Sequence, residues 1–207
     1  MLGLDSVPWH CGLVSFAALP DSAAWHHREA HSGFEVVFFR RLDDGHCHVE
    51  GWTAAVEDET AWVVDYEIEI DDAWATRWAR VTGRSAWGSR STRLDADGIG
   101  TWRINGEAAP HLDGCLDVDL ESSAFTNALP VHRMQLGIGE RSAAPAAYIR
   151  VVNLAVERLD QTYTRVGDEG TRLRFTYAAP AFKFACQMVY DASGLVLEYP
   201  GIAVRAG

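Results

Sequence analysis

Apolar and polar residues alternate along most of this chain in short runs that turn residues separate. The clearest run covers residues 61–71, where Trp62, Val64, Tyr66 and Ile68 occupy alternate positions and acidic residues separate the later ones. A period of two places alternate side chains on opposite faces of a strand. Such runs recur with turn signals about every ten residues, a spacing typical of all-β sandwiches and barrels. The pattern predicts a mainly β fold with antiparallel connections in one domain.

Most of the remaining elements are also predicted as strands. The expected strands are 34–42, 46–56, 61–71, 74–82, 85–94, 131–138, 147–159, 162–165, 171–177, 182–191 and 195–199. Residues 43–45 and the pair Asn105–Gly106 are predicted hairpin turns, as are Gly83 and Arg84. Residues 21–31 could form one or two amphipathic helical turns.

The segment 114–134 concentrates polar chemistry in an otherwise apolar pattern. Asp117 and Asp119 alternate with aliphatic residues, which predicts a half-buried strand with its carboxylates on one face. The next residues predict a tight connection or a short helix that ends before Pro130. The predicted strand 131–138 would follow, with Arg133 near its start. These elements would bring acids, Asn127 and a cation into one neighbourhood.

Composition and charge narrow the possible partners. The 207 residues carry a formal net charge of −11, and Lys183 is the only lysine. An acidic surface repels nucleic-acid phosphates and anionic lipid headgroups. The apolar run 11–19 has no basic segment before it, and no stretch approaches the ~20 apolar residues of a membrane span. We therefore expect no nucleic-acid partner, no transmembrane segment and a cytoplasmic location.

The cysteines and histidines offer candidate metal or disulfide chemistry. Four scattered cysteines without a CxxC pair favour free thiols. His46 and His48 share one strand face, a spacing compatible with metal binding, but no third ligand accompanies them. His27 and His31 are expected on a solvated surface. We predict no metal site and no cofactor.

Several motifs together resemble a bacterial family described as "putative glycolipid-binding". They are Gly114–Leu120, Thr126–Asn127 with Leu129–Pro130, Gln161–Thr164, and residues 191–196 followed by Tyr199–Pro200. The resemblance covers residues 25–207, and residues 1–24 form an N-terminal extension outside it. Ala124 and Ala128 depart from the proline and threonine usual in the family.

That resemblance carries structural and functional expectations. It implies a many-stranded antiparallel sheet curled in a barrel-like way around one short helix, a homodimer and an acidic pocket. It also implies binding of a glycolipid or similar amphiphile. The candidate ligand-binding residues are Asp117, Asp119, Asn127, Arg133, Glu35, Thr126 and Tyr163.

Each candidate also has a structural interpretation. Asp117 and Asp119 would lie roughly 6.5–7 Å apart on one strand face, where they could bind sugar hydroxyls, serve glycoside hydrolysis or face solvent. Arg133 could bind an anion, although pairing with Asp117 is favoured. Thr126 and Asn127 could instead close a turn.

We interpret the chain as a non-enzymatic binder of an amphiphile, with the acyl part on the concave apolar face of the sheet and the sugar in an acidic pocket. No GxSxG nucleophile motif occurs in the sequence. The alternatives are a carboxylate-based glycoside hydrolase and a homodimeric interaction module without a small-molecule ligand.

Overall fold

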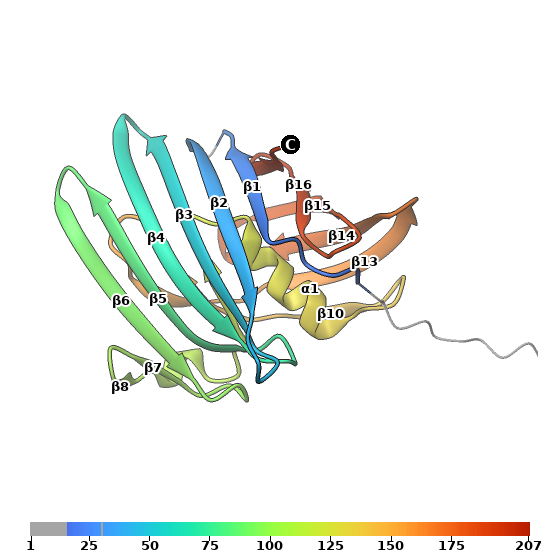
Figure 1. Cartoon of the computed structure of the whole chain (residues 1–207), viewed down its shortest axis with the longest axis horizontal. Helices are drawn as coiled ribbons and strands as arrows, with labels where there is room; N and C mark the ends of the chain where they lie inside the picture. The colour runs from blue at the N-terminus through green and yellow to red at the C-terminus, as the bar shows by residue number, and fades with distance from the viewer. Residues whose placement is uncertain (1–15, 30) are drawn as a thin grey trace, which may run out of the picture.

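In the part of the chain that the structure describes, the protein is a curled, mainly β structure with one α-helix inside the curl. A computed structural model describes residues 16–29 and 31–207. Within this part of the chain, fourteen strands form one large sheet and three form a small sheet. Figure 1 shows the helix α1 (Ala128–Met134) between the strands of the first half of the chain and those of the second half.

The strands of the first half form one side of the curl. They are β1 (Ser22–His27), β2 (Ser32–Arg41), β3 (Cys47–Glu57), β4 (Thr60–Ile70), β5 (Thr76–Ser85), β6 (Gly88–Ala96), β7 (Trp102–Ile104) and β8 (Glu107–Ala108). The later strands are β9 (Asp117–Leu120), β10 (Arg141–Ala143), β11 (Ala146–Ile149), β12 (Val156–Leu159), β13 (Thr162–Glu169), β14 (Arg172–Ala179), β15 (Phe184–Tyr190), β16 (Val196–Tyr199) and β17 (Ala203–Arg205). Short 3-10 turns are η1 (Pro110–Leu112), η2 (Phe125–Asn127) and η3 (Pro180–Phe182).

The large sheet is antiparallel throughout and remains open. Its order is β10-β13-β14-β15-β16-β17-β1-β2-β3-β4-β5-β6-β7-β8, so the last strand of the chain pairs with the first. Strands β10 and β8 lie at the two edges and do not pair with each other. The predicted barrel-like antiparallel sheet around one short helix is therefore confirmed, with the barrel left unclosed.

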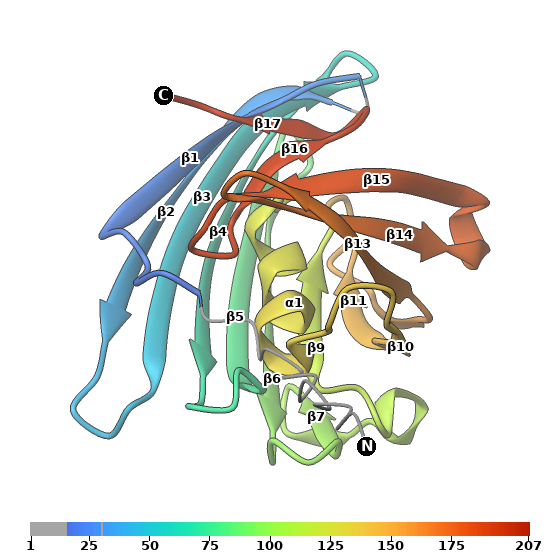
Figure 2. The same ribbon diagram turned by 90° about the vertical axis from the view of Figure 1, so that its right-hand side faces the viewer.

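The helix α1 fills the concave side of the curl, as Figure 2 shows. Ala128 and Leu129 pack into a core cluster with the inward residues of β1–β6, including Trp25 and Tyr66. On the other side, Val131 joins the cluster that β13–β16 contribute. Burial of these apolar side chains stabilises the curl. It also fills the concave face on which we expected an acyl chain to bind.

The small sheet, of order β12-β11-β9, corrects two expectations. Strand β9 pairs in parallel with β11, whereas we expected only antiparallel connections. All four residues of β9 are buried, so the prediction of a half-buried strand was wrong. The reason is that Val118 and Leu120 pack into the core under β1–β6. On the other face, Arg133 of α1 contacts Asp117, and Gln161 contacts Asp119.

Three further local predictions fail. Residues 21–31 contribute β1 rather than a helix because β1 has strand partners on both sides, β2 and β17. Gly83 and Arg84 lie within β5, and the predicted strand 147–159 is divided into β11 and β12.

Residues 131–138 do not form a strand because α1 continues through Pro130 to Met134. Pro130 is the third residue of α1, in the first turn, where the backbone N–H has no partner within the helix. The helix ends where Gln135 adopts a left-handed conformation, with φ 47°.

Some predictions concern residues at the margins of the structure. The run 11–19 and Cys11 lie largely or wholly outside the described residues. The predicted boundary between residues 24 and 25 falls within β1, and the division into an extension and one domain stays a prediction. Cys47, Cys115 and Cys186 are free. No helix among the described residues is long and apolar enough to cross a membrane.

Candidate functional site

The two aspartates of β9 lie on the same face of that strand, but they have different environments. Asp117 is 1% exposed and accepts two hydrogen bonds from Arg133, at 2.9 Å from Nε and 2.6 Å from Nη2. The gap that Asp117 shares with Asp119, Thr126 and Tyr163 has no volume open to water. Arg133 therefore pairs with Asp117, the arrangement that the sequence favoured. The Asp117 carboxylate is enclosed by this contact and by the surrounding side chains.

Asp119 begins a hydrogen-bond chain that holds η2 against β13. Its carboxylate accepts hydrogen bonds from Thr126 Oγ1 at 3.0 Å and from Gln161 Nε2 at 2.9 Å. The Tyr163 hydroxyl lies 3.1 Å from Gln161 Oε1 and 3.0 Å from Asn127 Oδ1. Burial raises the pKa of Asp119 to about 6, against the lowering effect of the hydrogen bonds from Thr126 and Gln161.

This raised pKa predicts how Asp119 affects stability. The folded chain binds the Asp119 proton more tightly than the unfolded chain, so its contribution is largest below about pH 4 and falls as pH rises to about 6. The slope is at most ~1.4 kcal/mol per pH unit. We expect urea unfolding to show that Asp119→Asn costs more stability at pH 4 than at pH 6.5.

Comparing the wild-type protein with the Asp119→Asn variant cancels the contributions of other titrating groups to the pH dependence of stability. Burial lowers the pKa of His31 and of His132 to about 4, and their effect on stability has the opposite slope. Both histidines are present in the wild type and in the variant, so their contributions cancel in the difference. A cost of Asp119→Asn that does not change with pH would contradict the assignment.

One side of Asp119 opens into a cavity of about 260 Å³, which we call the acid–aromatic pocket. Its polar lining consists of His31, Glu57, Asp119, Glu121, Ser123 and Asn127. Its apolar lining consists of Leu120, Tyr148, Leu159, Tyr177, Phe182, Phe184, Tyr199 and Ile202. The pocket thus lies between β9 with η2 on one side and β14–β16 on the other.

The aromatic rings of this pocket support one another. Tyr177 packs against Phe184 and Tyr199, with ring centroids 6.2 and 5.8 Å apart. Tyr148 packs against Phe182 at 5.4 Å, and the Arg150 guanidinium lies 5.2 Å from both of these rings. The rings are therefore held in place before any ligand arrives.

A buried polar network lies behind the pocket and includes Glu35. The Glu35 carboxylate accepts hydrogen bonds from Tyr66 Oη at 2.6 Å, from Ser123 Oγ and from Ala124 N–H at 2.8 Å. His27 Nε2 lies 3.4 Å from Glu35. Glu35 is fully buried and is linked to the pocket through Ser123 and through the pair His27–His31.

The histidine pair beside this network corrects an expectation. His27 and His31 are buried rather than solvated, and their ring nitrogens are 2.8 Å apart. His46 contacts Glu69 and His48 contacts Glu50, each at 3.2 Å. Among residues 16–29 and 31–207, no group of three or more His, Cys, Asp or Glu side chains is arranged to hold a metal ion.

The candidate residues therefore fall into two groups. Asp119 and Asn127 line the acid–aromatic pocket, whereas Asp117, Thr126, Arg133, Tyr163 and Glu35 lie around it in hydrogen-bond networks. The sequence interpretation missed Glu57, Glu121 and the five aromatic side chains. These residues come from five strands and two connecting segments, so no local motif signals them. The ligand-binding roles of the predicted candidates stay predictions.

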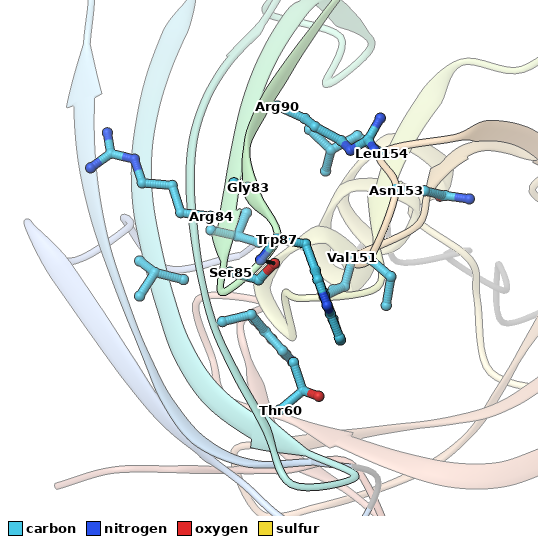
Figure 3. Close-up of a pocket in the computed structure, with 14 residues that line it drawn as sticks. Thr60, Gly83, Arg84, Ser85, Trp87, Arg90, Val151, Asn153 and Leu154 are labelled. Carbon is cyan, nitrogen blue, oxygen red and sulfur yellow. Dashed lines mark hydrogen bonds between the residues drawn. The ribbon is translucent and has the colours of Figure 1, made fainter.

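A second cavity lies on the other side of Trp62, and we call it the tryptophan pocket. It measures about 230 Å³ and is lined by Thr60, Trp62, Val63, Val64, Gly83, Arg84, Ser85, Trp87, Gly88, Arg90, Val151, Val152, Asn153 and Leu154. Figure 3 shows Trp87 between the β5–β6 hairpin and Val151, whereas the Arg84 side chain extends away from the pocket.

Comparisons with known proteins place this chain in a family. The model of a family described as "Putative glycolipid-binding" matches residues 22–205. A comparison with curated proteins finds no match.

Two solved structures show the same fold. A crystal structure of a DUF1089 family protein from Pseudomonas aeruginosa is 32% identical, covers 83% of this chain and 92% of its own, and has a TM-score of 0.71. A β-barrel-like DUF1849 protein from Brucella abortus is 10% identical, covers 92% of this chain and 96% of its own, and has a TM-score of 0.54. The second likeness concerns the fold alone. With a match over residues 22–205, this chain belongs to the putative glycolipid-binding family.

Proposed function

We propose that this protein binds a glycolipid or similar amphiphile without transforming it, and that the acid–aromatic pocket holds the sugar headgroup. The observation that carries the proposal is the combination of carboxylates, an amide and aromatic rings around one cavity of about 260 Å³. Family membership is consistent with it.

Sugar rings present hydroxyl groups at their edges and C–H groups on their faces, and the pocket matches both. Asp119, Glu57 and Glu121 offer carboxylate acceptors, and hydrogen bonds to charged acceptors are the stronger ones. The aromatic rings offer flat apolar surface for the C–H faces. Burial raises the pKa of Glu57, and nearby Glu121 and Asp58 raise it further.

The geometry disfavours glycoside hydrolysis by the two aspartates of β9. Hydrolysis requires two carboxyl groups that both reach the scissile bond. Asp117 is enclosed and its oxygens are bonded to Arg133, so only Asp119 faces a cavity. This pair of aspartates therefore does not fit the two carboxyl groups of a glycoside hydrolase. The predicted homodimer and cytoplasmic location rest on the sequence and the resemblance, and both stay predictions.

An alkyl glycoside tests the headgroup site. We expect dodecyl maltoside, titrated calorimetrically below its critical micelle concentration, to bind wild-type protein saturably. Phe182 is partly exposed at the pocket, so Phe182→Ala removes aromatic surface without opening the core. An aromatic contact contributes about 0.5–1.5 kcal/mol, so affinity should fall about twofold to twelvefold.

The outer face of the sheet offers a matched control. Phe38 is also a partly exposed aromatic residue, but it packs against Trp52, away from the acid–aromatic pocket. Phe38→Ala should leave the affinity unchanged. Equal effects of both substitutions, or equally tight binding of sugar-free lauric acid at the same site, would refute the proposed headgroup pocket.

A further inference from the structure

The tryptophan pocket provides a site for the apolar part of the ligand. We propose that it holds the aliphatic tail of the same amphiphile whose sugar occupies the acid–aromatic pocket. This inference rests on the proposed function and specifies where the second half of the ligand lies.

The two pockets differ in the charge of the residues that line them. Three acidic residues line the acid–aromatic pocket, whereas none of the residues that line the tryptophan pocket is acidic. The large apolar residues of the tryptophan pocket are Trp62, Val63, Val64, Trp87, Val151, Val152 and Leu154, and its polar residues are Thr60, Arg84, Ser85, Arg90 and Asn153. Its volume of about 230 Å³ is close to the 260 Å³ of the acid–aromatic pocket, and both are below the ~300–1,000 Å³ of sites for drug-sized ligands.

Large apolar side chains are left exposed at the same end of the molecule. Trp87 is 74% exposed and Val152 is 69% exposed, and both line the tryptophan pocket. Val63 and Val56 are also exposed and line the open depression next to it. An aliphatic chain in the pocket would remove part of this surface from water, which favours binding.

A thin wall separates the two pockets. The His31 ring lines one pocket and packs edge-on, at 5.1 Å, against Trp62, which lines the other. Glu57 and Thr60 are paired across the β3–β4 hairpin, and they line different pockets. Glu121 lines the acid–aromatic pocket and Val151 lines the tryptophan pocket. The Glu121 carboxylate accepts a 2.7 Å hydrogen bond from Val151 N–H. The two pockets are therefore neighbours that a single layer of side chains separates.

The core excludes the alternative tail site within the sheet. Phe125, Leu129 and Val118 are buried on the concave side and fill the space under β1–β6. An acyl chain there would have to displace packed side chains. The tryptophan pocket needs no such displacement, because its volume is already open.

The experiment compares hexyl and dodecyl maltoside, each below its critical micelle concentration. In wild-type protein the longer tail should bind at least tenfold more tightly. Trp87→Ala removes an exposed pocket wall, and Gly83→Val fills the floor, where an added Cβ lies 3.4 Å from Leu154 Cδ2. Each variant should remove most of the gain from the longer tail and leave hexyl maltoside binding nearly unchanged.

A second exposed tryptophan provides the control. Trp52 lies on the outer face of the sheet, and Trp52→Ala should keep the full gain from the longer tail. A gain that persists in both Trp87→Ala and Gly83→Val, while Phe182→Ala weakens both maltosides, would overturn the tail site and leave the headgroup site standing. If only the tail variants had effects and Phe182→Ala had none, the headgroup proposal would fail instead.

Discussion

Arg133→Met is expected to lower the free energy of unfolding by about 3–5 kcal/mol, the range observed when one partner of a buried ion pair is removed. The Arg133 and Asp117 side chains are 16% and 2% exposed, and two hydrogen bonds join them. The substitution would leave the Asp117 carboxyl enclosed without its cation. Methionine keeps the apolar stem and the helix propensity at the last turn of α1.

A surface pair with similar bonding serves as the control for this experiment. Arg93 Nε and Nη2 both donate to Asp95 Oδ1, at 3.0 and 2.7 Å, but these side chains are 48% and 41% exposed. Arg93→Met should cost less than about 1 kcal/mol because solvent screens exposed pairs. Chemical denaturation of both variants measures the contrast. Equal costs would contradict a structural role for the buried pair, and the double variant Asp117→Asn, Arg133→Met should recover part of the loss.

Gly51→Ala is expected to destabilise the sheet by about 3 kcal/mol or more. A Cβ at Gly51 would lie only 2.0 Å from Tyr66 Cζ on the neighbouring strand. The Tyr66 ring is fully buried and its hydroxyl donates a hydrogen bond to Glu35, so the ring cannot move without losing that bond. Overpacking costs about 1–3 kcal/mol, and an unsatisfied buried polar group adds about 1–3 kcal/mol.

Gly83 provides the comparison, since it also lies within a strand. An added Cβ there meets Leu154 Cδ2 at 3.4 Å, which is ordinary van der Waals contact. Gly83→Ala should leave the unfolding free energy unchanged or raise it by up to about 1 kcal/mol, because glycine is unfavourable inside strands. A similar loss of stability in both variants, measured by thermal and urea unfolding, would rule out the clash with Tyr66 as the cause.

The sheet was predictable because its strands carry a strong local signal. The buried positions Trp62, Val64, Tyr66 and Ile68 of β4 are those that the alternation predicts. The pair Asn105–Gly106 connects β7 and β8 as expected, with positive φ at both residues. Strand β1 was missed because residues 21–31 also fit a helical period, and only pairing with β2 and β17 decides between the two.

The site was only partly predictable because it depends on contacts between distant segments. The alternation of acids with aliphatics in β9 suggested an exposed acidic face, but it did not show that η2 and β13 cover that face. The pairing of Asp117 with Arg133 followed from proximity in sequence. Phe182 and Tyr148 lie far from β9 in the chain, so their convergence with Asp119 is visible only in the fold.

Native mass spectrometry of gently purified protein, followed by extraction and identification of any bound molecule, tests the central claim most directly. We predict that each chain carries one amphiphile with a sugar headgroup, and that Phe182→Ala lowers its occupancy while Phe38→Ala does not. A bound molecule without a sugar, or a chain that stays empty even after incubation with dodecyl maltoside, would contradict glycolipid binding.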